Sequence, residues 1–290
     1  MSEGRRKVTV LDLYRMKREK KRITWLTAYD YPTAQFAEAA GLDMLLVGDS
    51  LGMCVYGYDG TVPVTMDQCI VHSEAVRRGA PTAFVVGDMP FMSYQASDED
   101  AVRNAGRFLK EAGVDAIKLE GGLRVAGRIR AIVDAGVVVC GHIGLTPQSS
   151  GQLGGHKAQG RTLESALAVI RDADAVADAG AHLLLLEAVP PELGGHIARR
   201  LSIPVLSIGA GPECDGQLLI VSDVIGQFQA FTPKFVRRYA NVAEVVTSAM
   251  RGYVEDVRSG AFPADEHCYH MLSGEAEKLA DVLGGEGGGT

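Results

Sequence analysis

The chain has 290 residues and 47% of them are hydrophobic, so it can bury a large core and global disorder is excluded. Its formal net charge of −7 argues against a nucleic-acid-binding protein, which normally carries a basic face. No apolar run approaches the roughly 18–20 residues of a membrane helix, and the N-terminus lacks the apolar core of a secretory signal. The five cysteines are not in CxxC spacing, so we expect reduced thiols in a cytoplasmic protein without disulfides or structural zinc.

Residues 1–22 predict an N-terminal helical segment, whose basic run "RMKREKKR" we interpret as a solvated helix end. Eight short apolar runs follow, and they are nearly continuous rather than alternating, which is typical of parallel strands covered on both faces. The predicted strands are 23–29, 43–49, 83–89, 116–122, 137–145, 182–190, 203–211 and 218–226. The predicted helices include 32–40, 67–78, 98–112, 163–179 and 234–258.

This alternation predicts a (β/α)8 TIM barrel, a single α/β domain of about 250 residues. A doubly wound open sheet competes, but that fold usually has a glycine-rich loop after its first strand, and this chain has "TAYDYPTA" there. We place the barrel at 23–260, with one helix reduced because Gly211 to Leu218 is too short for a full helix. A C-terminal segment, 261–290, ends in "GGEGGGT", which we predict to be disordered.

Ionisable side chains stand near the C-terminal ends of five predicted strands in succession, where the active site of such a barrel lies. They are Asp49 (followed by Ser50), Asp88, Lys118 with Glu120, His142 and Glu187. Crowded carboxylates repel one another unless a cation or a proton lies among them. Asp49, Asp88 and Glu120 offer hard oxygen donors, which favours Mg²⁺. Alternatively, Asp49 is a helix cap for the segment after Ser50.

Lys118 has two interpretations, because a lysine on a barrel strand can form a Schiff base with a keto substrate. It lies two residues from Glu120, so both side chains point the same way and the acid keeps the ammonium charged. We therefore favour ion pairing between Lys118 and a substrate carboxylate. Glu187 follows four leucines and is a candidate acid or base, with a structural ion pair as the alternative. His142 is a candidate proton shuttle or an orienting residue.

Seven motifs occur in a specific order: "TAYDYPTA", "VGDSLGM", "DMPFMSYQ", "KLEGG", "GHIGLTPQ", "EAVP" and "IGAGPECDGQ". Together they resemble the 3-methyl-2-oxobutanoate (ketopantoate) hydroxymethyltransferase family, over about residues 24–239. The resemblance implies a barrel enzyme that transfers a hydroxymethyl group from 5,10-methylenetetrahydrofolate to 3-methyl-2-oxobutanoate. The product is 2-dehydropantoate, on the route to pantothenate and coenzyme A. Folate is consumed in this reaction and is therefore a cosubstrate.

The resemblance also implies roles for the rim residues. Asp49, Asp88 and Glu120 match the positions that surround Mg²⁺, and Glu187 matches the proton acceptor. Ser50 and Lys118 match substrate-binding positions, and we predict that Asp49 and Asp88 contact the substrate as well. The chemistry agrees, because Mg²⁺ chelated by the keto and carboxylate oxygens would acidify the C3 proton and stabilise the enolate. Family members form large homo-oligomers, commonly decamers.

Three other functions compete with this one. A Mg²⁺-dependent lyase or mutase of the isocitrate lyase and phosphoenolpyruvate mutase type would use similar carboxylates, but its "KKCGH"-type cysteine motif is absent. A class I aldolase would use Lys118 as its nucleophile. A non-catalytic metabolite-binding protein would have no use for a base at Glu187. We expect an α-keto acid and folate as partners, and neither nucleic acid nor membrane.

Overall fold

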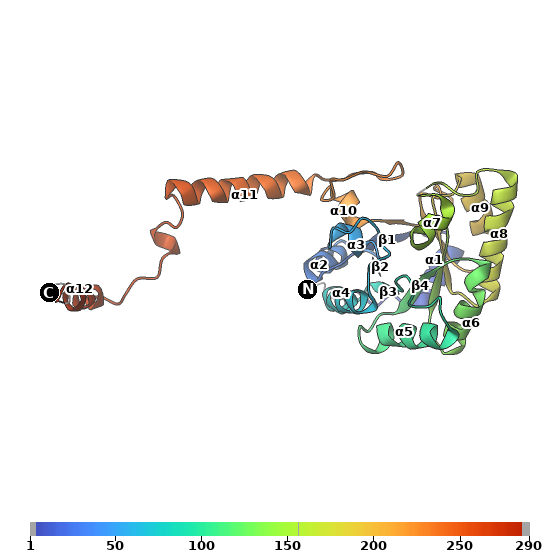
Figure 1. The fold of residues 1–290 in the computed structure, drawn as a ribbon, viewed down its shortest axis with the longest axis horizontal. Coiled ribbons are helices and arrows are strands. Elements are labelled where there is room, and N and C mark those ends of the chain that lie inside the picture. The colour runs from blue at the N-terminus through green and yellow to red at the C-terminus, as the bar shows by residue number, and fades with distance from the viewer. Residues whose placement is uncertain (1–3, 156, 286–290) are drawn as a thin grey trace. The chain divides into compact units, whose positions relative to one another are not determined.

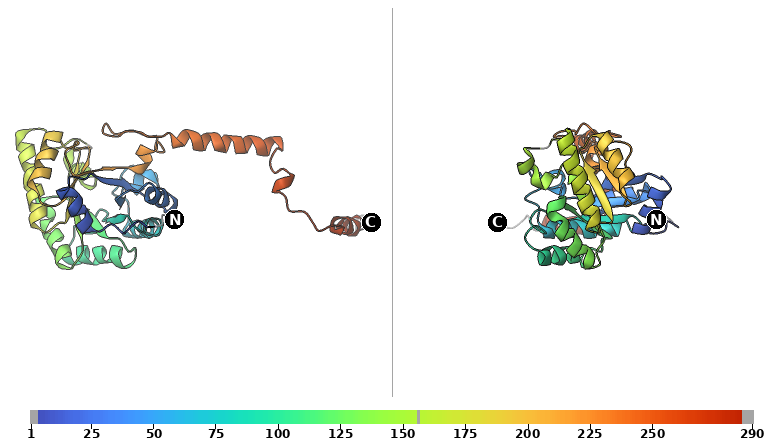
Figure 2. Two further views of the ribbon diagram at one scale, coloured as in Figure 1. Left: turned by 180° about the vertical axis from the view of Figure 1, so that it is seen from behind. Right: turned by 90° about the vertical axis from the view of Figure 1, so that its right-hand side faces the viewer.

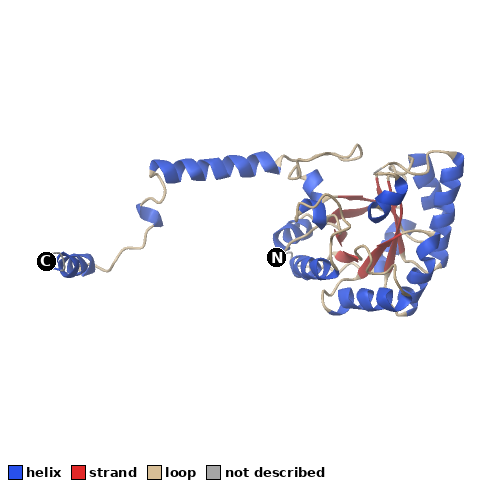
Figure 3. Ribbon diagram, viewed as in Figure 1, coloured by secondary structure: helices blue, strands red, loops and turns tan. Residues whose placement is uncertain are grey.

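The computed structural model describes residues 4–155 and 157–285, and the chain divides into two compact units, Met1–Ala240 and Asn241–Thr290. The first unit holds a closed barrel in which eight parallel strands follow one another in sequence order (Figures 1 and 3). This confirms the predicted (β/α)8 fold. The strands are β1 (Ile23–Thr27), β2 (Met44–Val47), β3 (Phe84–Asp88), β4 (Ala116–Glu120), β5 (Val139–Gly144), β6 (Leu183–Glu187), β7 (Val205–Ile208) and β8 (Gly216–Leu219).

Helices lie outside the strands of the first unit, as the right-hand view of Figure 2 also shows. They are α1 (Val10–Arg18), α2 (Tyr31–Ala39), α3 (Leu51–Cys54), α4 (Met66–Gly79), α5 (Asp98–Lys110), α6 (Ala126–Asp134), α7 (Ser150–Leu153), α8 (Leu163–Asp178), α9 (Pro191–Arg200) and α10 (Val221–Val224). Two 3-10 turns, η1 (Leu123–Val125) and η2 (Pro147–Ser149), precede α6 and α7. The second unit contains α11 (Val242–Ser259), η3 (Asp265–His267) and α12 (Glu275–Gly285).

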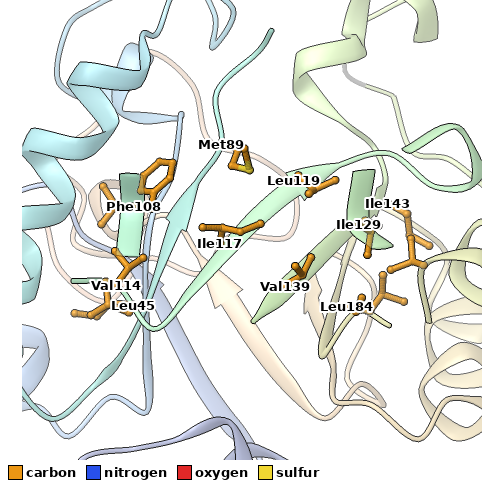
Figure 4. Packing of buried hydrophobic residues seen from close by; sticks show 14 of the residues in the cluster. Leu45, Met89, Phe108, Val114, Ile117, Leu119, Ile129, Val139, Ile143 and Leu184 are labelled. Carbon is orange, nitrogen blue, oxygen red and sulfur yellow. The ribbon is translucent and has the colours of Figure 1, made fainter. Parts of the chain in front are cut away.

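The barrel strands separate their apolar side chains into two shells. One shell fills the interior and includes Trp25, Phe84 and Leu183. The other packs against the surrounding helices, and Figure 4 shows part of it, including Ile117 of β4 beside Phe108 of α5. Successive residues of a strand face opposite sides, so residues of the two shells alternate along its sequence. Each strand sequence is therefore a continuous apolar run. Each large side chain that is fully buried here contributes roughly 1.5–3 kcal/mol to folding.

Helix α1 covers the end of the barrel where the strands begin. Its buried residues Leu13 and Met16 belong to the interior shell, together with Ile23 at the start of β1. A capping box starts the helix, since Thr9 N–H donates to Asp12 Oδ2 at 2.9 Å and Thr9 Oγ1 accepts from the Asp12 N–H. The functional site therefore lies at the opposite end of the barrel, where the strands end.

Two predicted elements were wrong. The eighth strand is Gly216–Leu219 rather than 218–226, and the apolar run continues into helix α10. A Cβ at Gly216 would lie 2.3 Å from the Ile23 carbonyl oxygen, so the close approach of β1 requires glycine where β8 begins. The helix predicted at 234–258 begins only at Val242. Residues 234–241 are not helical, and the Tyr239 N–H donates instead to the Val224 carbonyl.

One further expectation is confirmed within the described part of the chain. No helix separates β7 from β8, as the short connection predicted, and all five cysteines are free. None of the described helices combines the length and apolar character needed to cross a bilayer. Most of the tail predicted to be disordered, 284–290, lies outside the described residues. The domain limits of 1–22, 23–260 and 261–290 stay a prediction, although α11 falls in the second unit.

Candidate active site

The pairing register of neighbouring strands sets which rim residues lie side by side. Asp88 pairs with Lys118 across β3 and β4, and Glu120 pairs with His142 across β4 and β5. Glu187 continues the inward series of β6, two residues after Leu185 of the interior shell. Because side chains alternate along a strand, all five of these residues point into the barrel. They form a cluster in the barrel interior at the C-terminal ends of the strands.

Lys118 lies at the centre of this cluster. Its Nζ is 2.9 Å from Asp88 Oδ1, 3.6 Å from Glu120 Oε1 and 3.3 Å from His142 Nδ1. Burial opposes a charge on the lysine, but the carboxylates of Asp88, Glu120 and Asp49 outweigh it and hold the Lys118 pKa well above its ordinary value. The ammonium form is therefore stable here, and this does not fit a nucleophilic amine.

Asp49 follows β2 and is 4% exposed. Its backbone N–H donates to Asp88 Oδ2 at 2.9 Å, and its own Oδ2 accepts a hydrogen bond from Gln148 Nε2 at 2.9 Å. The N-cap of α3 is Ser50, and no side chain among the described residues caps that helix. Asp49 therefore belongs to the buried charge cluster rather than to a helix cap.

The cluster holds three buried carboxylates and one ammonium. Burial raises the pKa of Asp49, Asp88 and Glu120, and repulsion from neighbouring carboxylates raises that of Asp49 and Asp88 further. Asp88 Oδ1 is buried and has no hydrogen-bond partner in the described residues, although it contacts the Lys118 ammonium. Excess negative charge and hard oxygen donors fit a Mg²⁺ ion.

This metal site would not be complete without additional ligands. Across residues 4–155 and 157–285, no three His, Cys, Asp or Glu side chains converge closely enough to hold a metal ion by themselves. Mg²⁺ is usually held by one or two carboxylates together with water and substrate oxygens, so this arrangement still suits it. A ligand that brings its own oxygen atoms would complete the coordination.

His142 and Glu187 form a second pair beside the cluster. His142 Nε2 lies 3.1 Å from Glu187 Oε2, and its Nδ1 lies 3.3 Å from Glu120 Oε1. Burial lowers the His142 pKa and the Lys118 charge lowers it further, so the imidazole is neutral at neutral pH. The Glu187 side chain is 14% exposed, against 3% for His142, so Glu187 is the more accessible of the two.

Glycine is required next to Glu187. Gly144 is the strand partner of Glu187, and a Cβ on Gly144 would lie 2.3 Å from the Glu187 carbonyl oxygen. The φ of Gly144 is +91°, a conformation that residues with a side chain rarely adopt. The residue after Glu187, Ala188, also has a positive φ, 47°, which is sparsely populated for alanine and recurs at functional sites.

Sequence reasoning missed two uncharged residues that orient the carboxylates. Gln148 is 5% exposed, and its backbone N–H donates to Glu120 Oε2 at 3.0 Å while its side chain binds Asp49. The Tyr94 hydroxyl lies 2.7 Å from Gln148 Oε1 and accepts a hydrogen bond from the Glu120 N–H at 3.0 Å. Neither residue ends a strand or carries charge. The pattern of ionisable residues at strand ends therefore did not indicate them.

All the predicted site residues line one cavity of about 650 Å³, namely Asp49, Ser50, Asp88, Lys118, Glu120, His142 and Glu187. The Ser50 hydroxyl lies 2.8 Å from the Tyr29 hydroxyl. Small-molecule sites typically enclose about 300–1,000 Å³, so this cavity is large enough for a ligand well beyond the size of a small keto acid.

The fold is shared with solved structures of low sequence identity. A phosphonopyruvate hydrolase in complex with oxalate and Mg²⁺ is 14% identical, with a TM-score of 0.60 and 96% of each chain covered. A phosphoenolpyruvate phosphomutase from Streptomyces platensis subsp. rosaceus is 16% identical, with a TM-score of 0.59 and again 96% of each chain covered. These likenesses concern the fold alone.

Sequence relatives are much closer. The 3-methyl-2-oxobutanoate hydroxymethyltransferase of Alkaliphilus metalliredigens is 64% identical over 272 residues, 94% of this chain and 96% of that protein. The enzyme of the same name from Moorella thermoacetica is 53% identical, over 91% of this chain and 98% of that protein. A sequence model described as "Ketopantoate hydroxymethyltransferase" matches residues 7–265. The chain therefore belongs to the ketopantoate hydroxymethyltransferase family.

Proposed function

We propose that this protein transfers a hydroxymethyl group from 5,10-methylenetetrahydrofolate to 3-methyl-2-oxobutanoate, giving 2-dehydropantoate. Family membership and the names of its full-length relatives support this activity. The structural observation that carries it is the buried cluster of Lys118 and three carboxylates, set beside the His142–Glu187 pair in one cavity. Such a site can bind an α-keto acid and remove a proton next to its carbonyl group.

The substrate is held at the charge cluster. The Lys118 ammonium attracts the substrate carboxylate, and Ser50 lines the same cavity with a hydroxyl that can donate a hydrogen bond. Asp49, Asp88 and Glu120 would hold Mg²⁺ together with substrate and water oxygens. The metal, when bound, supplies Lewis-acid polarisation of the keto group. Gln148 keeps the carboxylates of Asp49 and Glu120 oriented through hydrogen bonds, and Tyr94 holds the Gln148 amide and the Glu120 backbone in place.

Glu187 accepts the C3 proton of the substrate. It is the more exposed member of the pair and lines the cavity, so a substrate carbon can approach its carboxylate. His142 is buried behind it, and its neutral imidazole orients the Glu187 carboxylate through the 3.1 Å contact. A neutral imidazole next to the Lys118 ammonium is a poor proton acceptor, because protonation would place two cations 3.3 Å apart.

Loss of the proton makes C3 nucleophilic, and C3 then attacks the methylene carbon carried by folate. The methylene carbon loses both of its bonds to the folate nitrogens. It gains the new carbon–carbon bond and a bond to the hydroxyl oxygen, which water supplies. Tetrahydrofolate leaves as the second product. Closeness of the two reactants in one enclosed cavity contributes to the rate, because the carbon–carbon step then becomes effectively unimolecular.

The direct test is to incubate the purified protein with 3-methyl-2-oxobutanoate, 5,10-methylenetetrahydrofolate and Mg²⁺ and to assay 2-dehydropantoate by mass spectrometry. We expect product in the complete mixture and none when folate is omitted. The Glu187→Gln variant serves as the matched inactive control. Failure of the complete mixture to give 2-dehydropantoate would contradict the proposed function.

The lyase or mutase alternative has only the shared fold in its support, at 14–16% identity. Assembly into a homo-oligomer, of which a decamer is the form that the resemblance implies, stays a prediction. So does a location in the cytoplasm.

A further inference from the structure

The cavity has a second wall that the keto acid does not need. Beyond the charge cluster, its lining includes Asp223, Phe228, Phe231 and Phe235, from the segment that follows β8. A small keto acid bound at the cluster would leave most of the roughly 650 Å³ free. Since the proposed reaction brings a second and larger reactant into the same cavity, this wall is a candidate site for that reactant.

Asp223 is the most informative residue of this wall. It is 5% exposed, yet no hydrogen bond or ion pair within the described residues engages its carboxylate. It does not cap α10, which has no side-chain cap. The nearby Arg238 influences Asp223 electrostatically, but its guanidinium donates to Thr232 Oγ1. The carboxylate lines the cavity and no described residue engages it, so a ligand in the cavity can donate hydrogen bonds to it.

The surroundings of Asp223 suit a flat aromatic ligand. The rings of Phe228 and Phe231 meet edge to face, with centroids 5.4 Å apart and an interplanar angle of 87°. Phe231 lines the cavity but keeps 53% of its surface exposed, so a bound ring could cover apolar area there. The Phe228 N–H donates to the Ser222 carbonyl at 3.1 Å, which folds this aromatic pair back onto the turn that carries Asp223.

A second polar atom without a partner lines the same cavity. Thr61 is 6% exposed, and its Oγ1 is buried with no hydrogen-bond partner in the described part of the chain. Asp223 and Thr61 line one cavity, and neither side chain has a partner among the described residues, which favours a ligand with several polar atoms. An apolar occupant would leave both groups unsatisfied.

This part of the cavity lies close to the end that holds Ser50. Ser222 Oγ contacts Cys54 Sγ at 3.3 Å, and Cys54 ends the one-turn helix α3 that begins next to Ser50. Asp223 directly follows Ser222, and it lines the same cavity as Ser50.

We propose that Asp223 accepts hydrogen bonds from the 2-amino group and the N3–H of the folate pterin ring, with Phe228 and Phe231 as its apolar wall. The pterin presents these two donors side by side, as a guanidinium does, and a carboxylate matches that pair with two parallel hydrogen bonds. This inference rests on the proposed function, which supplies the folate cosubstrate. It adds the residue that recognises the pterin.

The test compares Asp223→Asn with Asp59→Asn. Asp59 is an exposed aspartate that lines the same cavity, so its substitution makes the same change of charge there. We expect Asp223→Asn to raise the KM for 5,10-methylenetetrahydrofolate by roughly 10–100-fold. Loss of hydrogen bonds to a charged group lowers affinity by about this factor. The KM for 3-methyl-2-oxobutanoate should change far less, and Asp59→Asn should match the wild type in both.

Two further measurements separate recognition from a structural effect. Calorimetric titration with tetrahydrofolate should show the same loss of affinity in Asp223→Asn without turnover. A tetrahydrofolate analogue with a methyl group in place of the 2-amino group should bind the wild type weakly, and Asp223→Asn should weaken it little further. A merely structural role would weaken both ligands equally in the variant, and that result would overturn the inference.

The outcomes also distinguish this inference from the proposed function. If the wild type makes 2-dehydropantoate but Asp223→Asn keeps the wild-type affinity for tetrahydrofolate, the pterin assignment is wrong and the function stands. The assignment is also wrong if Asp59→Asn is the variant that loses affinity. If the wild type neither binds tetrahydrofolate nor makes product, both are wrong.

Discussion

His142 Nε2 lies 3.1 Å from Glu187 Oε2, and the two residues stand on the adjacent strands β5 and β6. One member is a buried neutral imidazole and the other is a carboxylate that reaches the cavity. This arrangement separates two roles that the sequence left interchangeable. We propose that the carboxylate accepts the substrate proton and that the imidazole orients it.

Substitution of each member should therefore have a different effect. Glu187→Gln removes the proton acceptor, and we expect deuterium exchange at C3 of 3-methyl-2-oxobutanoate to slow by roughly 10²–10⁴-fold. His142→Asn removes an orienting contact only and should slow exchange much less. NMR in D2O measures both rates, and circular dichroism checks that each variant is folded. A larger loss in His142→Asn than in Glu187→Gln would reverse the assignment.

Asp88 tests the metal assignment. Asp88→Asn keeps the size of the side chain but removes one of the buried charges of the cluster. We expect Mg²⁺ affinity to fall by roughly 10–100-fold or more, because loss of a residue that only hydrogen-bonds a metal ligand already has an effect of this size. Mg²⁺-dependent activity should be lost. Calorimetric titration with Mg²⁺ measures the first effect directly. EDTA should inactivate the wild type reversibly, and full activity of the variant would refute the assignment.

Lys118 should not react as an amine. The carboxylates around it hold the ammonium form, so borohydride added with 3-methyl-2-oxobutanoate should leave the protein mass unchanged. Intact-mass spectrometry, followed by peptide mapping of 116–120, provides the measurement. A reduced adduct on Lys118, together with activity that survives EDTA, would favour the class I aldolase alternative.

Gln148 should contribute to stability and to Mg²⁺ affinity although it carries no charge. Gln148→Ala leaves Asp49 Oδ2 and the Tyr94 hydroxyl without their amide partner, which we expect to destabilise the fold by about 1–3 kcal/mol and to lower Mg²⁺ affinity. Gln152 provides the matched control, because it is an exposed glutamine in the helix α7 that follows Gln148. Gln152→Ala should stay within about 0.5 kcal/mol of the wild type in chemical denaturation. Equal stability and Mg²⁺ affinity in the two variants would contradict the orienting role.

The sequence predicted the barrel and the rim because both follow from local patterns. Continuous apolar runs marked the strands, and ionisable residues at the ends of five runs marked the site, since parallel strands all finish on one face of a barrel. The end of the chain's last apolar run was less predictable. An apolar segment such as 218–226 is compatible with a strand or with a buried helix. Its division at Leu219 depends on the pairing of Gly216–Leu219 with β1, which exists only in the closed barrel.

The orienting residues could not be predicted for a different reason. Gln148 and Tyr94 act through hydrogen bonds to residues 99 and 26 positions away, Asp49 and Glu120, which only the closed barrel brings within reach. Asp223 belongs to the same category. Its position after an apolar run was visible, but the burial and the missing partner of its carboxylate depend on how the segment 220–235 folds over the cavity.

The central claim is that this site removes the C3 proton of 3-methyl-2-oxobutanoate. The most direct measurement is NMR of deuterium incorporation at C3 in D2O, with and without Mg²⁺, in the presence of tetrahydrofolate, which fills the folate site but carries no methylene group. We predict Mg²⁺-dependent incorporation by the wild type and its loss in Glu187→Gln. No incorporation by the wild type with Mg²⁺ and tetrahydrofolate both present would contradict the account.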